Sequence, residues 1–220
     1  MTMNIIFRKP NDNDIDKINH FIADIFNKVE PVNQGIGLCG NCMLNWASSP
    51  PISIGKLSID SNLSLLAEHE GQLIGARLIS ISDRPQKIDN DVSINFEYCD
   101  KCKKKGEDFD RFLKMLYKLK NQVWDLVPSD VTKLAHREIS AVKKEYQRKG
   151  IGRQLAEKEF SDEYLRSLGI HGIVSETSSI ANQHLLKSIG FKPLAEEKYS
   201  DYDIHPADGG QSLVLNFKKI

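Results

Sequence analysis

The sequence has no long hydrophobic run and no excess of charge of either sign. None of its 220 residues fall in a segment apolar enough to span a bilayer, and the apolar part of residues 1–8 is too short for a signal peptide. Thirty basic side chains balance thirty acidic ones, which argues against nucleic acid, an anionic membrane or a polyanion as partner. We therefore expect a cytoplasmic protein that binds neither nucleic acid nor membrane.

Cysteine is also scarce, and its placement is unusual. All four cysteines fall into two C-x-x-C pairs, Cys39 with Cys42 and Cys99 with Cys102. Two such pairs can supply the four thiolates of a tetrahedral Zn²⁺ site, which would be structural because no position is left open for water or substrate. The 56 residues between the pairs (43–98) are more than a compact zinc ribbon has. A redox dithiol, unrelated free thiols and disulfides therefore remain as alternatives.

The chain is long enough for one sizeable core, and its 40% hydrophobic and 27% charged residues are ordinary for a globular protein. The hydrophobic pattern predicts elements in the order βα, ββ, α, βα, βα, ββ, which favours one mixed α/β domain over residues 1–220. The expected strands are 4–8, 63–69, 73–81, 132–142, 170–175, 192–199 and 212–217. The expected helices are 15–29, 109–126, 150–168 and about 178–188. Residues 30–62 should be irregular apart from a short helix near Cys42–Trp46, and the lysine-rich run 101–105 should be a solvated loop.

The most informative segment is Gln147–Gly152, between a β-branched strand and a helix. Backbone N–H groups without partners in the first turn of a helix, together with the helix dipole, favour a phosphate. Gly150 and Gly152 have no Cβ and would allow a pyrophosphate to approach the main chain, while Arg148, Lys149 and Arg153 would add positive charge. Alone, the segment would be interpreted as an ordinary turn with two glycines.

Three motifs and the order of elements resemble the GNAT superfamily of N-acetyltransferases. Gln147-x-x-Gly150-x-Gly152 resembles its acetyl-CoA signature after the fourth strand, and 185–191 (Leu-Leu-Lys-Ser-Ile-Gly-Phe) resembles the end of its later motif. Glu30-Pro-Val-Asn33 is similar to a segment of the insect-type arylalkylamine N-acetyltransferases. The resemblance implies one GNAT-like domain, with a mixed, mostly antiparallel sheet of six to seven strands flanked by helices.

The resemblance also implies where acetyl-CoA would bind. The acetyl-CoA-binding part is expected at about 131–191, with the pantetheine arm along the fourth strand and the N–H of Val142 polarising the thioester. The expected cofactor-binding residues are Ala141, Val142, Gln147, Arg148, Lys149, Gly150, Ile151, Gly152, Arg153 and Ser178.

An alkylamine arrives as an unreactive ammonium, because its pKa lies near ~10, so the reaction needs a base. By resemblance, Glu30 corresponds to the base of the insect-type enzymes. His136 and Glu138 occupy positions that carry a histidine pair in the vertebrate enzymes, and alternation along a strand places both on one face. Each has an ordinary alternative: a solvated carboxylate for Glu30, a structural histidine for His136 and an ion pair for Glu138.

The leaving thiolate needs a proton donor, and here the chain departs from the family. Many members use a tyrosine four residues before the Gly-Phe pair, where this chain has Leu186. The insect-type enzymes carry serines near the start of that helix; Ser178 matches the first and Asn182 replaces the second. Ser178 is therefore a candidate for binding the sulfur or relaying its proton, and otherwise an N-cap.

The resulting hypothesis is an acetyl-CoA-dependent N-acetyltransferase for a small primary amine, an arylalkylamine, acting by direct transfer in a ternary complex. The alternatives are a polyamine, amino-sugar or protein N-terminal acceptor, and an inactive zinc-stabilised interaction module. Loops 30–62 and 83–108 should border the acceptor, where a structural Zn²⁺ would order them. Aromatic candidates to line that site are Trp46, Phe96, Tyr98 and Trp124.

Overall fold

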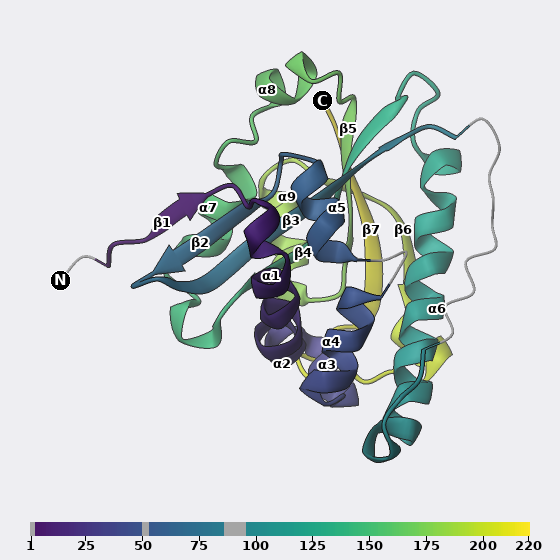
Figure 1. The fold of residues 1–220 in the computed structure, drawn as a ribbon. Helices are drawn as coiled ribbons and strands as arrows, with labels where there is room; N and C mark the ends of the chain where they lie inside the picture. Colours follow the sequence, from purple (N-terminus) through teal and green to yellow (C-terminus); the bar gives the residue numbers. More distant parts are fainter. Residues whose placement is uncertain (1–2, 50–52, 86–95) are drawn as a thin grey trace.

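A seven-stranded sheet runs through the molecule, in the order β1-β2-β3-β4-β5-β7-β6. The computed structural model describes residues 3–49, 53–85 and 96–220 (Figure 1). Every neighbouring pair of strands is antiparallel except β4 and β5, which are parallel. The expected mixed, mostly antiparallel sheet is thus confirmed. The strands are β1 (Ile6–Arg8), β2 (Leu65–His69), β3 (Gln72–Asp83), β4 (Lys133–Val142), β5 (Gly172–Thr177), β6 (Lys192–Lys198) and β7 (Ser212–Lys219).

Helices cover both faces of the sheet, because its buried strands present apolar side chains to both sides. One face packs against the N-terminal helices and the long α6, and the other against the later helices (Figure 1). The helices of the first face are α1 (Ile15–Phe21), α2 (Asn27–Val29), α3 (Pro31–Ile36), α4 (Gly40–Ser48), α5 (Ile54–Asp60) and α6 (Lys103–Leu126). Those of the second are α7 (Ile151–Glu157), α8 (Asp162–Ser167) and α9 (Ile180–Ser188). None of the helices in the described ranges is long and apolar enough to cross a membrane.

Residues 30–62 are more regular than expected. They form α3, α4 and α5, of which only a short helix near Cys42–Trp46 was predicted. Each of the first two helices begins at a local cap: the Glu30 carboxylate accepts the N–H groups of Val32 and Asn33, and the Cys39 sulfur accepts the N–H of Cys42. Caps of this kind stabilise helices too short for a hydrophobic period to reveal.

Two other helix predictions were wrong in their bounds. The long helix begins at Lys103 rather than Phe109, so residues 103–105 of the run expected as a solvated loop form its exposed start, after a 3-10 turn that contains the buried Cys102. The helix predicted over 150–168 is broken into α7 and α8. Glu159 adopts a left-handed conformation at the break (φ 53°), Phe160 is buried, and Ser161 caps the second helix.

The two loops expected at the acceptor side are only partly described, since residues 50–52 and 86–95 of these segments lie outside the described residues. The remainder packs on the first face of the sheet, beside α6.

Candidate functional site

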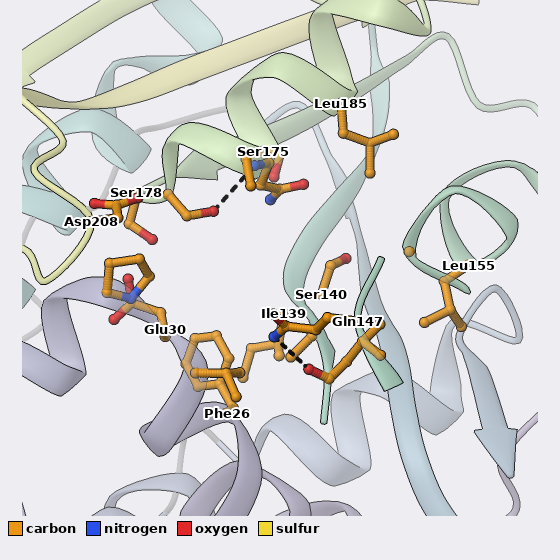
Figure 2. Close-up of a pocket in the computed structure, with 18 of the residues that line it drawn as sticks. Phe26, Glu30, Ile139, Ser140, Gln147, Leu155, Ser175, Ser178, Leu185 and Asp208 are labelled. Atoms are coloured by element: carbon orange, nitrogen blue, oxygen red, sulfur yellow. Dashed lines mark hydrogen bonds between the residues drawn. The ribbon is translucent and has the colours of Figure 1, made fainter. Parts of the chain in front are cut away.

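A cavity of about 480 Å³ opens where β4 and β5 diverge. The two strands pair at three positions only, from Leu134 opposite Gly172 to His136 opposite Val174. Farther along, β4 carries a bulge: Leu78 pairs with Ile139 and Ile79 with Arg137, which leaves Glu138 without a partner on β3. Beyond the last pair with β5, Ser140, Ala141 and Val142 of β4 line the cavity; Ser140 is labelled in Figure 2.

The predicted anion-binding turn forms one end of this cavity. Gly150 adopts a left-handed conformation (φ 78°), and α7 starts at Ile151. The first backbone N–H donor within the helix is that of Gln154, which bonds the carbonyl of Gly150. A Cβ placed on Gly150 or Gly152 would meet no atom within 4 Å, so the space beside the helix terminus is open. The turn therefore offers backbone N–H groups to an anion.

The expected cofactor-binding residues divide into those that line the cavity and those that do not. Ala141, Val142, Gln147, Arg148, Gly152 and Ser178 line it, whereas Lys149, Gly150, Ile151 and Arg153 do not. The Gln147 side chain donates to the carbonyl of Val142 (2.9 Å; Figure 2), which closes the turn against β4. The Arg153 guanidinium bonds Glu157 and Ser188, and Lys149 lies over the ring of Tyr146. Ile151 is buried in the core.

A second cavity of about 210 Å³ adjoins the first and is mostly apolar. The two cavities share Phe26, Glu30, Glu138, Ile139, Glu176 and Ser178. Residues of α6 at helical spacing supply one wall of the second cavity: Phe109, Phe112, Leu113, Leu116, Tyr117 and Lys120. Of the expected aromatic residues only Trp46 lines it. Tyr98 instead bonds Asp110 and meets the Phe96 ring edge to face, and Trp124 lies under Arg84.

Glu30 lies at the junction of the cavities and is buried rather than solvated. Its carboxylate accepts the N–H groups of Val32 (3.1 Å) and Asn33 (2.6 Å) as the cap of α3. Burial raises the pKa of Glu30, and hydrogen bonds from the Ser178 hydroxyl and the two amides offset only part of that rise. A carboxylate in this position can accept a proton at a higher pH than a solvated one.

Glu138 and His136 belong to a buried ion network with Lys120 and Glu176. The Lys120 ammonium of α6 and the Ser80 hydroxyl both donate to Glu138. Nε2 of His136 lies 3.0 Å from Glu176, and its Nδ1 lies 3.9 Å from Glu138. Burial acts to raise the pKa of Glu138, but the charges of Lys120 and His136 dominate and lower it to about 2. The pKa of Glu176 is also lowered, because its partners His136 and Lys120 outweigh its burial.

His136 itself lines neither cavity; Glu138 and Glu176 stand between its ring and the junction. The pattern of two positions on one face is thus confirmed, but only Glu138 of the pair reaches the cavity directly. His136 can act there only through its carboxylate partners.

Ser178 faces Glu30 and Asp208 across the junction (Figure 2). It is not the cap of α9: Ser179 fills that role by accepting the N–H of Asn182 (3.2 Å). The hydroxyl of the buried Tyr199 donates to the carbonyl of Ser178 (3.0 Å) and fixes the backbone there. The Ser178 hydroxyl is thereby left to face the cavity.

The four cysteines converge at one point, away from both cavities. Their sulfur atoms all lie within 4.8 Å of one another, and none forms a disulfide. The two C-x-x-C pairs meet despite their separation in the sequence, and this cluster can bind a metal ion.

Lys120, Glu176 and Asp208 are site residues that sequence reasoning missed. Lys120 interrupts the apolar stripe of a predicted helix, and Glu176 directly follows a predicted buried strand. A charged residue in such a place is costly unless it is paired, which was the available signal. Nothing in the polar loop around Asp208 distinguishes it from its neighbours.

Comparison with solved structures establishes the fold. The chain is similar to arylalkylamine N-acetyltransferase 2 from Aedes aegypti, with 19% identity, 99% of each chain covered and a TM-score of 0.74. It is similar to Drosophila melanogaster polyamine N-acetyltransferase, which forms N-acetylagmatine (14% identity, 99% and 100% covered, TM-score 0.64). It is also similar to the C-terminal condensation domain of Ebony in complex with beta-alanyl-dopamine (12%, 100% of each chain, TM-score 0.69). No family sequence model and no curated relative matches the chain. The chain has the GNAT fold, in a form similar to that of the insect arylalkylamine enzymes.

Proposed function

We propose that the protein transfers the acetyl group of acetyl-CoA to the primary amine of a small arylalkylamine. The observation that carries this proposal is the junction: an open cavity beside a phosphate-binding turn meets an apolar cavity at three carboxylates and a serine. The first cavity suits a long, extended donor with a pyrophosphate, and the second suits an aromatic body. The reacting groups would meet at Glu30 and Ser178.

Acetyl-CoA would bind with its pyrophosphate at the turn Gln147–Gly152, with Arg148 adding charge at the cavity wall. Its pantetheine arm would lie along the main chain of Ser140–Val142, which β5 leaves without a partner. The part of the chain from about 131 to 191 supplies these groups, while segments near 30–62 and 83–108, together with α6, supply the acceptor side.

Glu30 is the proposed base. The neutral amine attacks the thioester carbonyl, a C–N bond forms and the C–S bond breaks. The proton released by the amine passes to Glu30. The departing thiolate takes a proton from Ser178, and Ser178 recovers one from Glu30, so the products are the amide and the CoA thiol. Glu138 is a poorer base because its pKa of about 2 keeps it ionised and tied to Lys120.

The apolar lining favours an aromatic acceptor over a polyamine. A second ammonium at the far end of a polyamine would lie among the apolar side chains of the second cavity, away from the carboxylates at the junction, where little would compensate its desolvation. The similarity in fold to both kinds of enzyme does not decide between them. The proposal includes a structural Zn²⁺ at the four cysteines. This metal would have no part in the chemical step, since four thiolates fill its coordination shell.

The test is a thermal-shift titration with acetyl-CoA followed by a thiol-release assay over a panel of aromatic amines, polyamines and amino sugars. We expect stabilisation by acetyl-CoA and turnover of aromatic amines with the best kcat/KM. Stabilisation without turnover of any amine would instead support an interaction module that has kept the fold. No stabilisation by acetyl-CoA would point to another acyl donor, since the fold also occurs in a condensation domain.

A further inference from the structure

We propose that the four cysteines bind one Zn²⁺, and that this metal fixes the amine-side wall of the apolar cavity. The metal site stands on its own geometry, and its effect on the amine rests on the function proposed above.

The arrangement of the sulfurs matches a tetrahedral thiolate site. All four lie within 4.8 Å of one another, and the Cys39 and Cys99 sulfurs are 3.8 Å apart. Zinc–sulfur bonds of about 2.3 Å in a tetrahedron place sulfurs about 3.8 Å apart. A disulfide needs about 2.05 Å, so the cluster has the spacing of shared coordination and not of oxidised pairs.

Backbone amides point at the sulfurs, as expected around a thiolate ligand. The N–H of Cys39 donates to the Cys102 sulfur (3.4 Å), that of Cys99 to the Cys42 sulfur (3.5 Å), and that of Cys42 to the Cys39 sulfur (3.5 Å). Two of these three bonds join one pair to the other. Hydrogen bonds of this type stabilise the charge of ligating sulfurs and orient them.

The chemistry of the ligand set favours zinc. Four thiolates with no carboxylate or imidazole among them exclude Mg²⁺ and Ca²⁺, which prefer oxygen. Two C-x-x-C turns from separate segments form the usual Cys₄ structural zinc site. Each pair also lies where a helix begins: the Cys39 sulfur caps α4, and Cys102 occupies the N-cap position of α6 without a side-chain capping bond. The positive ends of both helix dipoles therefore face the thiolates.

The same two helices build the wall of the apolar cavity. Trp46 of α4 and Phe109 of α6 both line the cavity. Trp46 lies seven residues after Cys39 and Phe109 seven residues after Cys102, which is about 10 Å along a helix. Their rings meet edge to face at 5.5 Å. Farther along α6, Lys120 bonds Glu138 at the junction. A metal that joins the starts of α4 and α6 therefore sets the distance between the two sides of the wall.

Apart from the cysteine contacts and the apolar packing around Trp46 and Phe109, few side-chain bonds join these helix starts in the described part of the chain. The Lys105 ammonium bonds the carbonyl of Gly37 (2.8 Å), but both groups are at an exposed surface. The pairs are brought together over 60 residues of chain (Cys39 to Cys99), so closing this loop has an entropic cost that the metal can offset.

The experiment uses the full chain purified with zinc present, and compares Cys99→Ser and Cys102→Ser with Lys101→Ser. Lys101 is an exposed residue between the two cysteines and serves as the matched control. We measure zinc per chain, the visible spectrum after replacement by Co²⁺, the fluorescence of Trp46 in a Trp124→Phe background, the KM for the best amine and the Kd for acetyl-CoA.

We expect one zinc per wild-type chain and the spectrum of a tetrahedral cobalt tetrathiolate. The cysteine variants should lose zinc, change the Trp46 emission and raise the amine KM by about tenfold, with the acetyl-CoA Kd changed by less than about twofold. Lys101→Ser should match the wild type. If the cysteine variants do not fold, removing zinc from the wild-type protein with a chelator gives the same comparison.

Wild-type protein with well under one zinc per chain, or no tetrahedral cobalt spectrum, would overturn the metal site. Zinc removal that leaves fluorescence and amine KM unchanged would overturn its effect on the wall. If no amine is turned over, the proposed function fails, while zinc content, cobalt spectrum and fluorescence still decide the metal site and its link to Trp46.

Discussion

At the scale of single residues, the site is defined by carboxylates whose surroundings differ. Burial raises the pKa of Glu30, and its neutral hydrogen-bond donors offset only part of that rise. Glu138 is buried beside an ammonium, so its pKa falls to about 2. The same side chain is therefore prepared to exchange a proton at one position and to remain charged at the other.

The first prediction concerns Glu30→Gln, which removes the proposed base while retaining an amide oxygen that can cap α3. We expect kcat to fall by about 100-fold, with little change in acetyl-CoA affinity. In the wild type, kcat/KM should rise with pH as Glu30 loses its proton. In the variant, this rise of kcat/KM with pH should be absent. Glu138→Gln is the matched control and should keep it. Collapse of acetyl-CoA binding in Glu30→Gln would show that the assigned role is wrong.

The second prediction follows from the direction of the same pKa shift. Because the pKa of Glu30 is higher in the folded than in the unfolded state, the folded state holds more protons. Its free energy of unfolding therefore decreases as pH rises through that range. Urea denaturation at pH 5 and pH 8 gives the free energy of unfolding of wild type and Glu30→Gln. From pH 5 to pH 8 this free energy should fall more for the wild type than for the variant. A difference independent of pH would mean that Glu30 titrates normally.

Residues could be assigned from the sequence only where a local motif identified them. Glu30 and Ser178 were found through short motifs, and the four cysteines through their spacing. Lys120 and Glu176 were missed because they matter only through tertiary contacts. Lys120 of α6 bonds Glu138 of β4, and Glu176 of β5 bonds His136 of β4. Arg153 was expected at the phosphate site; its guanidinium bonds Glu157 and Ser188 and does not line the cavity, and its part in binding stays a prediction.

At the scale of elements, a strand bulge and a helix face cooperate to form the junction. Because of the bulge, Glu138 of β4 has no pairing partner on β3, and Lys120 of α6 donates to its carboxylate. The order of strands and the long helix were predictable from hydrophobic periods. The bulge and the short capped helices were not, because each depends on one or two hydrogen bonds rather than on a repeated pattern.

The third prediction tests the ion pair between these elements. Lys120→Met leaves the Glu138 charge buried without its partner, and we expect a loss of about 3 kcal/mol in the free energy of unfolding. The double variant Lys120→Met/Glu138→Gln removes both charges and should recover much of that loss, as measured by urea denaturation at pH 7. An additive double variant would show that the two side chains do not interact.

The fourth prediction tests the start of α7. Gly152→Asp places a negative charge in open space in the first turn, where it should leave the unliganded protein as stable as the wild type or slightly more so. The same charge repels a pyrophosphate, so the acetyl-CoA Kd should rise by at least about tenfold. Calorimetric titration and unliganded Tm separate the two effects. Unchanged affinity would place the pyrophosphate elsewhere.

At the scale of the whole molecule, the two sides of the sheet carry different parts of the candidate site. The α7–α9 side carries the proposed phosphate-binding turn and the candidate thiol-relay serine, whereas the α1–α6 side carries the proposed base, the apolar cavity and the cysteine cluster. The fold class was predictable from the order of elements, whereas the division into a donor side and an acceptor side stays a prediction. The position of the cysteines beside the helices of the cavity wall was only a general expectation.

The divergence of β4 and β5 has a further consequence, for hydrogen exchange and for solubility. It creates a sheet edge inside the molecule, and exposed edges are places where proteins aggregate by strand pairing. Here the edge lies within a cleft between α7 and α9, so a neighbouring chain cannot reach it but a slender extended molecule can. The amides of Ser140–Val142 that point into the cleft should therefore exchange quickly in the empty protein and slowly once an extended ligand occupies it. The ligand would in effect complete the sheet.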